Sequence, residues 1–226
     1  MDEDKYAAVR QNMVKTQLIP RGIADPRVLA AMRKVPRHRF VPSHLWDQAY
    51  NDYPLPIGED QTISQPYIVA LMTEILEPRE GDKVLEIGMG SGYQAAILAE
   101  LVAQVFTIDR MAPLIASARQ VLESLGYRNI KTRLGDGTEG WPEEGPFDGI
   151  MVTAAAPQVP RPLTEQLALG GRLVIPVGDR YSQTLTLVRQ TKDGLKYEYH
   201  GGCRFVPLIG KYGWLEGEGR GGIFSD

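Results

Sequence analysis

The spacing of hydrophobic residues changes along the chain, from a helical period to short apolar runs. In the first 50 residues, apolar side chains recur at helical spacing, at Val9, Met13, Val14 and Leu18, which predicts a helix over residues 6–18. Pro20 and Gly22 interrupt this pattern. A second helix is predicted to begin after Asp25, a good N-cap residue, and to end before Pro36.

Beyond this region, short β-rich runs are separated by segments of helical length. The runs are KVLEI (83–87), VFTI (105–108), IKTRL (130–134), FDGIMV (147–152) and RLVIPV (172–177). Helices are expected over residues 68–76, 93–101, 112–125 and 162–169. Such alternation is typical of βαβ units. It predicts an α/β fold with a doubly wound, mainly parallel, Rossmann-like sheet.

Three other segments complete the expected organisation. The turn-rich string NDYPLPIG (51–58) predicts a connector, and the runs 183–189 and 195–200 flank Lys-Asp-Gly, which predicts a C-terminal antiparallel hairpin. Five glycines among the last fourteen residues predict a mobile tail. We therefore expect a helical N-terminal cap (1–50), one α/β domain (51–212) and a tail (213–226).

Composition narrows the class of protein. The net charge of −3 and pI of about 5.7 give no global basic field, so neither nucleic acid nor an anionic membrane is an expected partner. One cysteine excludes an intramolecular disulfide, and three scattered histidines argue against a zinc site, so no metal is expected. No apolar run is long enough to cross a bilayer, and the N-terminus lacks the pattern of a secretory signal. We expect a cytoplasmic, monomeric enzyme or binding protein.

The strand at 83–87 leads into a glycine-rich loop, E-x-G-x-G-x-G, formed by Glu86, Gly88, Gly90 and Gly92. Such loops bring backbone N–H groups at a helix N-terminus close to a nucleotide-type ligand. A tight turn without a ligand is the alternative. The dinucleotide pattern G-x-G-x-x-G requires a small residue where Tyr93 stands, whereas an acid two residues before the first glycine resembles the first motif of S-adenosylmethionine-dependent methyltransferases.

Two acids follow the next two strands. Asp109 is placed to accept hydrogen bonds from ribose hydroxyls, and Asp136, followed by Gly137, is placed to accept one from an adenine amino group. A helix N-cap is the alternative for Asp109, and an ordinary Asp-Gly turn is the alternative for Asp136. Together with the glycine loop, these strand ends predict an adenosine site.

Four motifs in order make the chain recognisable. They are QTISQP (61–66), VLEIGMGSGYQAAILAEL (84–101), GDGTEGWPEEGPFDGIMVTAAAP (135–157) and RFVPL (204–208). Over residues 20–210 the chain resembles the protein-L-isoaspartate O-methyltransferase family. The resemblance implies a repair enzyme that transfers a methyl group from S-adenosylmethionine to the free α-carboxylate of L-isoaspartyl residues in damaged proteins and peptides.

The resemblance also assigns residues. Ser64 matches the active-site serine, which orients the substrate carboxylate, while Glu86, Gly88, Asp109 and Asp136 match cofactor-binding positions. Gly90, Gly92 and Gly137 belong to the same cofactor loops, and Arg204 and Val206 are candidate substrate-binding residues.

Purely structural roles remain possible for the proposed substrate-binding residues. Ser64 is also a natural N-cap for the helix that follows it, and Arg204 is equally suited to packing its stem on the surface. Three other classes also remain open: a methyltransferase acting on a small molecule or nucleic acid, a non-catalytic nucleotide binder, and a dehydrogenase.

Overall fold

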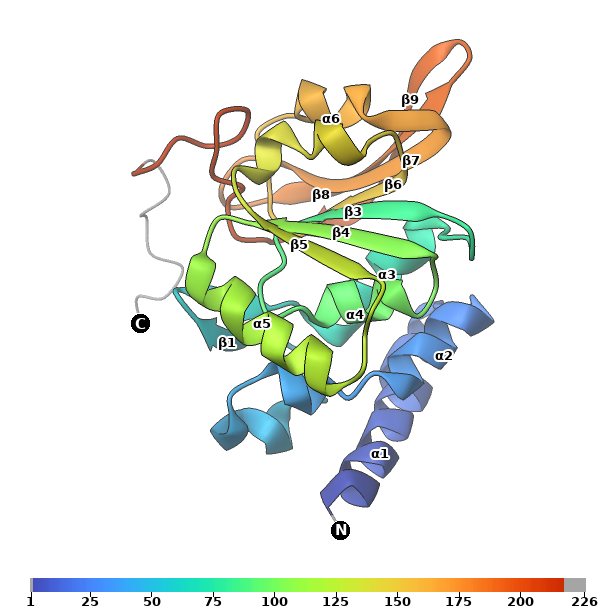
Figure 1. Cartoon of the computed structure of the whole chain (residues 1–226). Helices are drawn as coiled ribbons and strands as arrows, with labels where there is room; N and C mark the ends of the chain where they lie inside the picture. The colour runs from blue at the N-terminus through green and yellow to red at the C-terminus, as the bar shows by residue number, and fades with distance from the viewer. Residues whose placement is uncertain (1, 218–226) are drawn as a thin grey trace.

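A seven-stranded sheet forms the centre of the computed structural model, which describes residues 2–217 and the side chains of residues 5–217. The strand order is β5-β4-β3-β6-β7-β8-β9 (Figure 1). The bounds are β3 (Lys83–Ile87), β4 (Gln104–Asp109), β5 (Ile130–Leu134), β6 (Phe147–Val152), β7 (Leu167–Gly178), β8 (Gln183–Thr191) and β9 (Gly194–Cys203). Strands β3 to β7 pair in parallel, whereas β8 and β9 are antiparallel. The predicted fold class and C-terminal hairpin are therefore confirmed.

Helices cover both faces of the sheet. On one face lie α3 (Pro66–Leu76), α4 (Tyr93–Ala99) and α5 (Ala112–Ser124), and on the other lie η5 (Gly137–Glu139), η6 (Pro142–Glu144) and α6 (Arg161–Glu165) (Figure 1). Neighbouring strand residues therefore belong to different cores: Val105 packs in the cluster on the α3–α5 face, and Phe106 packs in the opposite cluster. Burial on both faces explains why β6 and the second half of β7 are nearly continuous apolar runs.

The N-terminal segment is helical, as predicted. It comprises α1 (Asp2–Met13), the π-helical turn η1 (Val14–Leu18), η2 (Ile19–Arg21), α2 (Pro26–Lys34), η3 (Arg37–Phe40) and η4 (Ser43–Gln48). The Asp25 carboxylate accepts a hydrogen bond from the N–H of Arg27 at 2.7 Å, so the predicted cap is confirmed. Met32 contacts the Tyr93 hydroxyl in the same apolar cluster that underlies α3 and α4. The helical segment thus packs on the α3–α5 face of the sheet.

Two predicted elements differ in the structure. The helix expected over 162–169 ends at Glu165, because Leu167 already pairs with Phe147 as the first residue of β7. The expected connector contains a strand, β1 (Leu55–Gly58), which forms a hairpin with β2 (Gln61–Ile63). Its tight turn passes through Gly58, Glu59 and Asp60, all with positive φ, a conformation that apolar periodicity does not reveal.

The start of the expected tail contacts the domain. Trp214 donates its backbone N–H to Leu208 and its indole N–H to Ala155, and Glu216 forms an ion pair with Arg110. Residues 218–226, on which most of the predicted tail falls, lie outside the described residues. Among residues 2–217, no helix is both long and apolar enough to cross a membrane.

Candidate functional site

The glycine loop adopts a conformation that non-glycine residues rarely reach. Gly88, Gly90 and Gly92 all have positive φ, between 52° and 94°. At Gly88 a Cβ atom would also lie 2.5 Å from Thr153 Oγ1, so a side chain is excluded twice over. The Gly88 N–H donates to the carbonyl of Ile108 at 2.8 Å, and α4 begins directly after Gly92. The loop therefore exposes its backbone, rather than side chains, at the carboxyl end of β3, as the glycine motif predicts.

Glu86 lies behind this loop and is fully buried. One carboxylate oxygen accepts a hydrogen bond from Thr107, and the other has no hydrogen-bond partner among the described residues. Burial raises the pKa of Glu86 to about 8; the charge of Asp109 adds to the shift, whereas the hydrogen bond from Thr107 opposes it. An unpaired buried oxygen is costly in the protein alone, and it suits a polar ligand group placed at the loop.

Asp109 and Asp136 both bind backbone. Asp109 accepts hydrogen bonds from the N–H groups of Gly90 and Met111, at 2.8 and 2.9 Å. It is not the N-cap of α5, because Met111 occupies that position. Asp136 caps η5 by accepting from Thr138 at 2.8 Å, and its other oxygen accepts from the N–H of Lys211 at 2.8 Å. The structure therefore supports the alternative that Asp136 stabilises a turn. Its predicted role in binding adenine stays a prediction.

Gly137 is required by close packing rather than by an unusual φ. A Cβ atom there would lie 2.4 Å from Cγ2 of Ile87, the last residue of β3. The loop after β5 thus presses against the start of the glycine loop. A further link joins the two neighbouring strand ends, because the Gly135 N–H donates to the carbonyl of Asp109 at 2.9 Å.

Ser64 lies on the other side of the glycine loop. Together with Gly88 and Gly90 it lines a cavity of about 40 Å³, enough for roughly one small group. The prediction that Ser64 caps the following helix is wrong: Gln65 occupies the N-cap position of α3, and no side chain caps it. The Ser64 hydroxyl, which has no hydrogen bond within residues 2–217 of the structure, is therefore available to a ligand.

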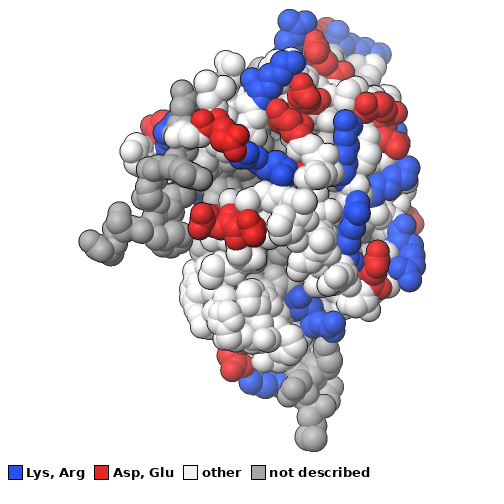
Figure 2. Space-filling view, turned by 60° about the vertical axis from the view of Figure 1, so that its left-hand side comes forward, with Lys and Arg blue, Asp and Glu red and all other residues white. Residues whose placement is uncertain are grey.

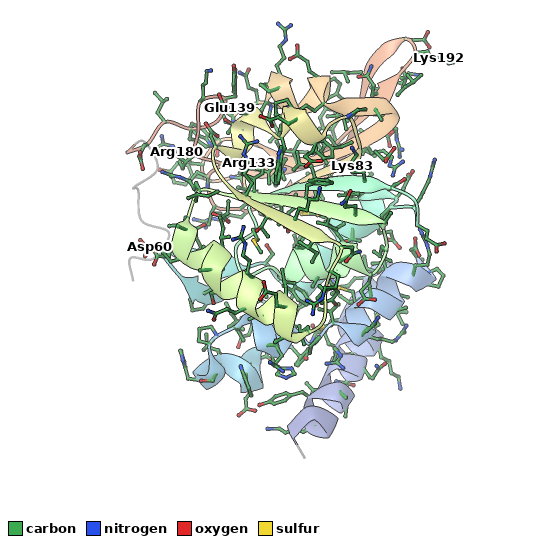
Figure 3. All side chains as sticks on the ribbon, in the orientation of Figure 1. Asp60, Lys83, Arg133, Glu139, Arg180 and Lys192 are labelled. Atoms are coloured by element: carbon green, nitrogen blue, oxygen red, sulfur yellow. The ribbon has the colours of Figure 1, made fainter. Side chains whose placement is uncertain are left out.

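A second hollow, of about 170 Å³, lies beside Gly90 and was not predicted from the sequence. Apolar side chains from distant segments line it, among them Phe40, Ile57 and Leu114. The hairpin β1–β2, whose turn at Asp60 is marked in Figure 3, brings Ile57 to the loop. These residues carry no motif, and only tertiary packing identifies them.

Arg204 and Val206 do not line the cavity shared by Ser64, Gly88 and Gly90. The exposed Arg204 follows β9 directly. The carbonyl of Val206 accepts a hydrogen bond from Ala155, in the segment after β6, at 2.8 Å. Val206 is thus placed at the same edge of the sheet as the glycine loop, whereas within residues 2–217 no hydrogen bond or ion pair joins Arg204 to the other predicted residues.

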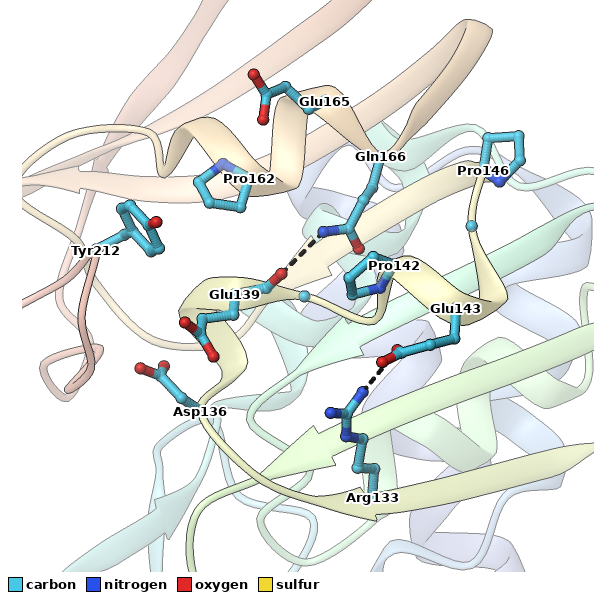
Figure 4. Close-up of a pocket in the computed structure, with 12 residues that line it drawn as sticks. Arg133, Asp136, Glu139, Pro142, Glu143, Pro146, Pro162, Glu165, Gln166 and Tyr212 are labelled. Carbon is cyan, nitrogen blue, oxygen red and sulfur yellow. Dashed lines mark hydrogen bonds and ion pairs between the residues drawn. The ribbon is translucent and has the colours of Figure 1, made fainter.

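A wider hollow, of about 730 Å³, lies elsewhere in the described part of the chain (Figure 4). It lies among η5, η6 and α6, and of the predicted residues only Asp136 borders it. Most of its charged groups already have ion-pair partners: Arg133 binds Glu143 within the hollow, and Glu139 binds Lys211 outside it. Size alone therefore does not identify the functional site.

The residues at the carboxyl ends of β3, β4 and β5 fit an adenosyl and amino-acid ligand. Gly88, Gly90 and Gly92 present backbone without side chains at the loop, Glu86 has an unpaired oxygen, and Asp109 stands beside the loop. Such a loop on a mainly parallel sheet defines the class of S-adenosylmethionine-dependent methyltransferases. Among the described residues, no three His, Cys, Asp or Glu side chains converge as a metal site would require.

Comparisons with known proteins identify the family. The model of the protein-L-isoaspartate(D-aspartate) O-methyltransferase family matches residues 9–213. A protein-L-isoaspartate O-methyltransferase from Trichlorobacter lovleyi is 60% identical over 210 residues, covering 92% of this chain and 97% of that one. Protein-L-isoaspartate O-methyltransferase 1 from Syntrophobacter fumaroxidans is 59% identical over 209 residues, covering 92% and 98%. The chain therefore belongs to the protein-L-isoaspartate(D-aspartate) O-methyltransferase family.

Solved structures agree. A structure of a protein-L-isoaspartate O-methyltransferase superposes with a TM-score of 0.83 at 30% identity, covering 90% of this chain and 67% of that chain. A Plasmodium falciparum chain described as belonging to the same family, in complex with S-adenosyl-L-homocysteine, gives 0.77 at 26% identity, covering 88% and 98%. The adenosine ligand expected from the sequence is thus of the kind found in that structure.

Proposed function

We propose that this chain methylates the free α-carboxylate of L-isoaspartyl residues in damaged proteins and peptides, and that Ser64 orients this carboxylate for attack. The observation that carries the proposal is the cavity shared by Ser64, Gly88 and Gly90. It puts a free hydroxyl beside the backbone that would hold the methyl donor, so the two reactants can meet.

The reaction needs little acid–base chemistry. A carboxylate with a pKa of about 4 is already ionised at neutral pH, so no side chain must remove a proton. When bound, S-adenosylmethionine supplies an electrophilic methyl group on a sulfonium: the C–S bond breaks as the C–O bond forms, and no proton moves. The amide nitrogen that follows the damaged residue then attacks the ester carbonyl, methanol leaves, and part of the resulting succinimide hydrolyses to normal aspartate. The chain must therefore supply placement, which contributes about 7–11 kcal/mol in well-oriented reactions.

Each predicted residue then has a proposed part. Gly88, Gly90 and Gly92, which carry no side chain, let the amino-acid end of the donor approach the loop backbone closely, with the unpaired Glu86 oxygen behind it. Asp109 receives the ribose hydroxyls, while Asp136 and Gly137 form the adenine side.

On the substrate side, Ser64 donates its hydroxyl to the α-carboxylate. Among residues 2–217, the carbonyl of Val206 accepts a hydrogen bond but its N–H donates none. We propose that this N–H pairs with an extended substrate backbone. The exposed Arg204 steers the substrate carboxylate from solution toward the site.

A pair of peptides that differ only at one residue tests the function. The isoaspartyl peptide and its aspartyl counterpart are incubated with methyl-labelled S-adenosylmethionine and the full chain. Alkali-labile label on the isoaspartyl peptide alone is the expected result. Label on both peptides, or binding of the donor without any transfer, would reject the proposal in favour of another methyltransferase or a non-catalytic binder.

We propose that a monomer is the catalytic unit, because Ser64 and the glycine loop meet at one cavity without a contribution from a second copy. Specific activity per chain should then be independent of enzyme concentration. Figure 2 shows Lys and Arg side chains interspersed with Asp and Glu on the face it presents, in keeping with the proposal that substrates are proteins rather than nucleic acids or membranes. The proposed cytoplasmic location is tested by cell fractionation.

A further inference from the structure

The last strand of the sheet has an open edge. β9 pairs with β8 on one side and ends the strand order of the described sheet. Every residue from Gly194 to Gly202 is exposed, including Tyr199 with 72% of its surface accessible. Lys192 marks the tip of this hairpin, which projects from the rest of the sheet (Figures 1 and 3). A long exposed edge of this kind is a template for pairing with another strand.

The register of the hairpin determines which backbone groups are available. Lys192 and Asp193 form a two-residue turn, so Thr191 and Gly194 make the first hydrogen-bonded pair. Alternate pairs follow, and Lys196 and Glu198 also direct their backbone groups toward β8. The N–H and C=O groups of Leu195, Tyr197 and Tyr199 consequently point away from the sheet. Three residues on the outer edge can therefore bond to an added strand.

The side chains on this edge are complementary to themselves. If two copies of β9 pair antiparallel about Tyr197, Leu195 lies opposite Tyr199 of the second copy, and all three outward-facing residues form hydrogen-bonded pairs. In the same register Lys196 lies opposite Glu198 of the second copy, twice by symmetry. Pairing centred on Lys196 or on Glu198 would oppose like charges, which is destabilising. The register centred on Tyr197 bonds the outward-facing backbone groups and also places each Lys196 opposite a Glu198 of the second copy.

The charges on the strand are available for such pairing. Lys196 has no ion-pair partner among the described side chains, although Arg189 lies opposite it on β8. Glu198 binds Arg189 at 2.7 Å through one carboxylate oxygen, which leaves the other oxygen open. The Lys196 ammonium group of a second copy could therefore bind the free oxygen of Glu198, which would give Lys196 an ion-pair partner.

We propose that two copies of this chain associate reversibly through antiparallel pairing of their β9 edges, centred on Tyr197. Pairing of single strands buries far less surface than a permanent dimer, so the association is weak and concentration-dependent. The proposed active site lies wholly within each chain, and catalysis by the monomer is unaffected.

Sedimentation velocity of the full chain, over a series from micromolar to submillimolar concentration, measures this association. The average mass of the wild-type chain is expected to rise toward that of a dimer. Lys196→Glu places two glutamates opposite each other at both symmetric positions and should raise the dissociation constant about tenfold or more. Lys15→Glu, an exposed site on η1 with the same charge change, should leave the constant unchanged.

A mixing experiment separates pairing from any general effect of substitution. Lys196→Glu and Glu198→Lys should each associate poorly alone, but their equimolar mixture should form a heterodimer in which every opposed pair is complementary. Thermal unfolding of each variant confirms that it is folded. A wild-type chain that stays monomeric, an unchanged constant in Lys196→Glu, or a mixture that remains monomeric would each overturn the proposal.

Discussion

The Asp109 carboxylate, at the end of β4, accepts a hydrogen bond of 2.8 Å from the backbone N–H of Gly90 in the loop after β3. One side chain therefore both shapes the glycine loop and stands where the ribose is proposed to bind. The two roles are compatible, because an ionised carboxylate has about four acceptor positions and the backbone donors use two of them.

Replacing Asp109 with Ala should weaken S-adenosylmethionine binding. The variant loses acceptors for the ribose hydroxyls and the bond that holds the loop, and hydrogen bonds to charged groups contribute about 1.5–3 kcal/mol. We expect the dissociation constant, measured by titration calorimetry, to rise about 10- to 100-fold. Asp109→Asn, which keeps one acceptor oxygen, should give an intermediate value. An unaltered constant in Asp109→Ala would remove this residue from the binding site.

Ser64→Ala should lower turnover without lowering stability. The hydroxyl is not the cap of α3, so its removal costs the helix nothing, whereas the substrate carboxylate loses its orienting donor. A misplaced reactant can cost about a hundredfold in rate, and we expect a loss of that order in kcat/KM on an isoaspartyl peptide. The melting temperature should match that of the wild type.

Ser43→Ala provides the control for Ser64, because Ser43 is an exposed serine at the start of another short helix. It should change neither activity nor melting temperature. If Ser64→Ala instead lost about 1 kcal/mol of stability at full activity, the residue would be acting as a structural cap.

Glu86 should make stability depend on pH. Because burial raises its pKa from 4.5 to about 8, the folded chain keeps the Glu86 proton in this range while the unfolded chain releases it. The free energy of unfolding contributed by Glu86 therefore falls as pH rises through this window, with a slope of up to about 1.4 kcal/mol per pH unit.

Glu86→Gln removes this dependence. In urea unfolding, the variant should gain stability relative to the wild type between about pH 5 and about pH 8. Glu123→Gln, on the exposed face of α5, should show a constant difference from the wild type across the same range. A constant difference for Glu86→Gln as well would mean that its carboxyl is ionised when folded.

The sequence predicted the position of an element closely where its residue pattern is compatible with only one kind of local structure. β3, β5 and β6 have the predicted bounds. Burial on both faces favours apolar residues in β3 and β6, whereas the edge strand β5 is marked by its β-branched Ile130 and Thr132. The glycine loop was equally clear, since positive φ at Gly88 leaves few other residues possible. The repeated strand and helix order then determined the topology.

Features that depend on tertiary contacts were not predicted. Residues 162–169 have the composition of a helix, but pairing of Leu167 with Phe147 replaces its second half with a strand. Ser64 satisfies the local rule for a cap, yet the chain begins α3 one residue later, after Gln65. The apolar wall of Phe40, Ile57 and Leu114 beside the loop joins three distant segments, so no local signal announces it.

Gly137→Ala should separate the effect of close packing from that of backbone conformation. Its φ is not in the left-handed region, so alanine is conformationally acceptable there, but the added Cβ would lie 2.4 Å from Cγ2 of Ile87. Overpacking of a well-filled core costs about 1–3 kcal/mol, and we expect a loss of that size in urea unfolding. The strain falls on the last residue of β3, so S-adenosylmethionine binding should weaken as well.

Gly81→Ala is the matched control for Gly137, because it also lacks a positive φ and its Cβ would meet no atom within 4 Å. It should leave stability within about 0.5 kcal/mol of the wild type or raise it slightly, since alanine reduces the entropy of the unfolded chain. If both substitutions had the same small effect, the loop after β5 would have room to move away from Ile87. The close approach of the two strand ends would then not be what holds the adenosine site in shape.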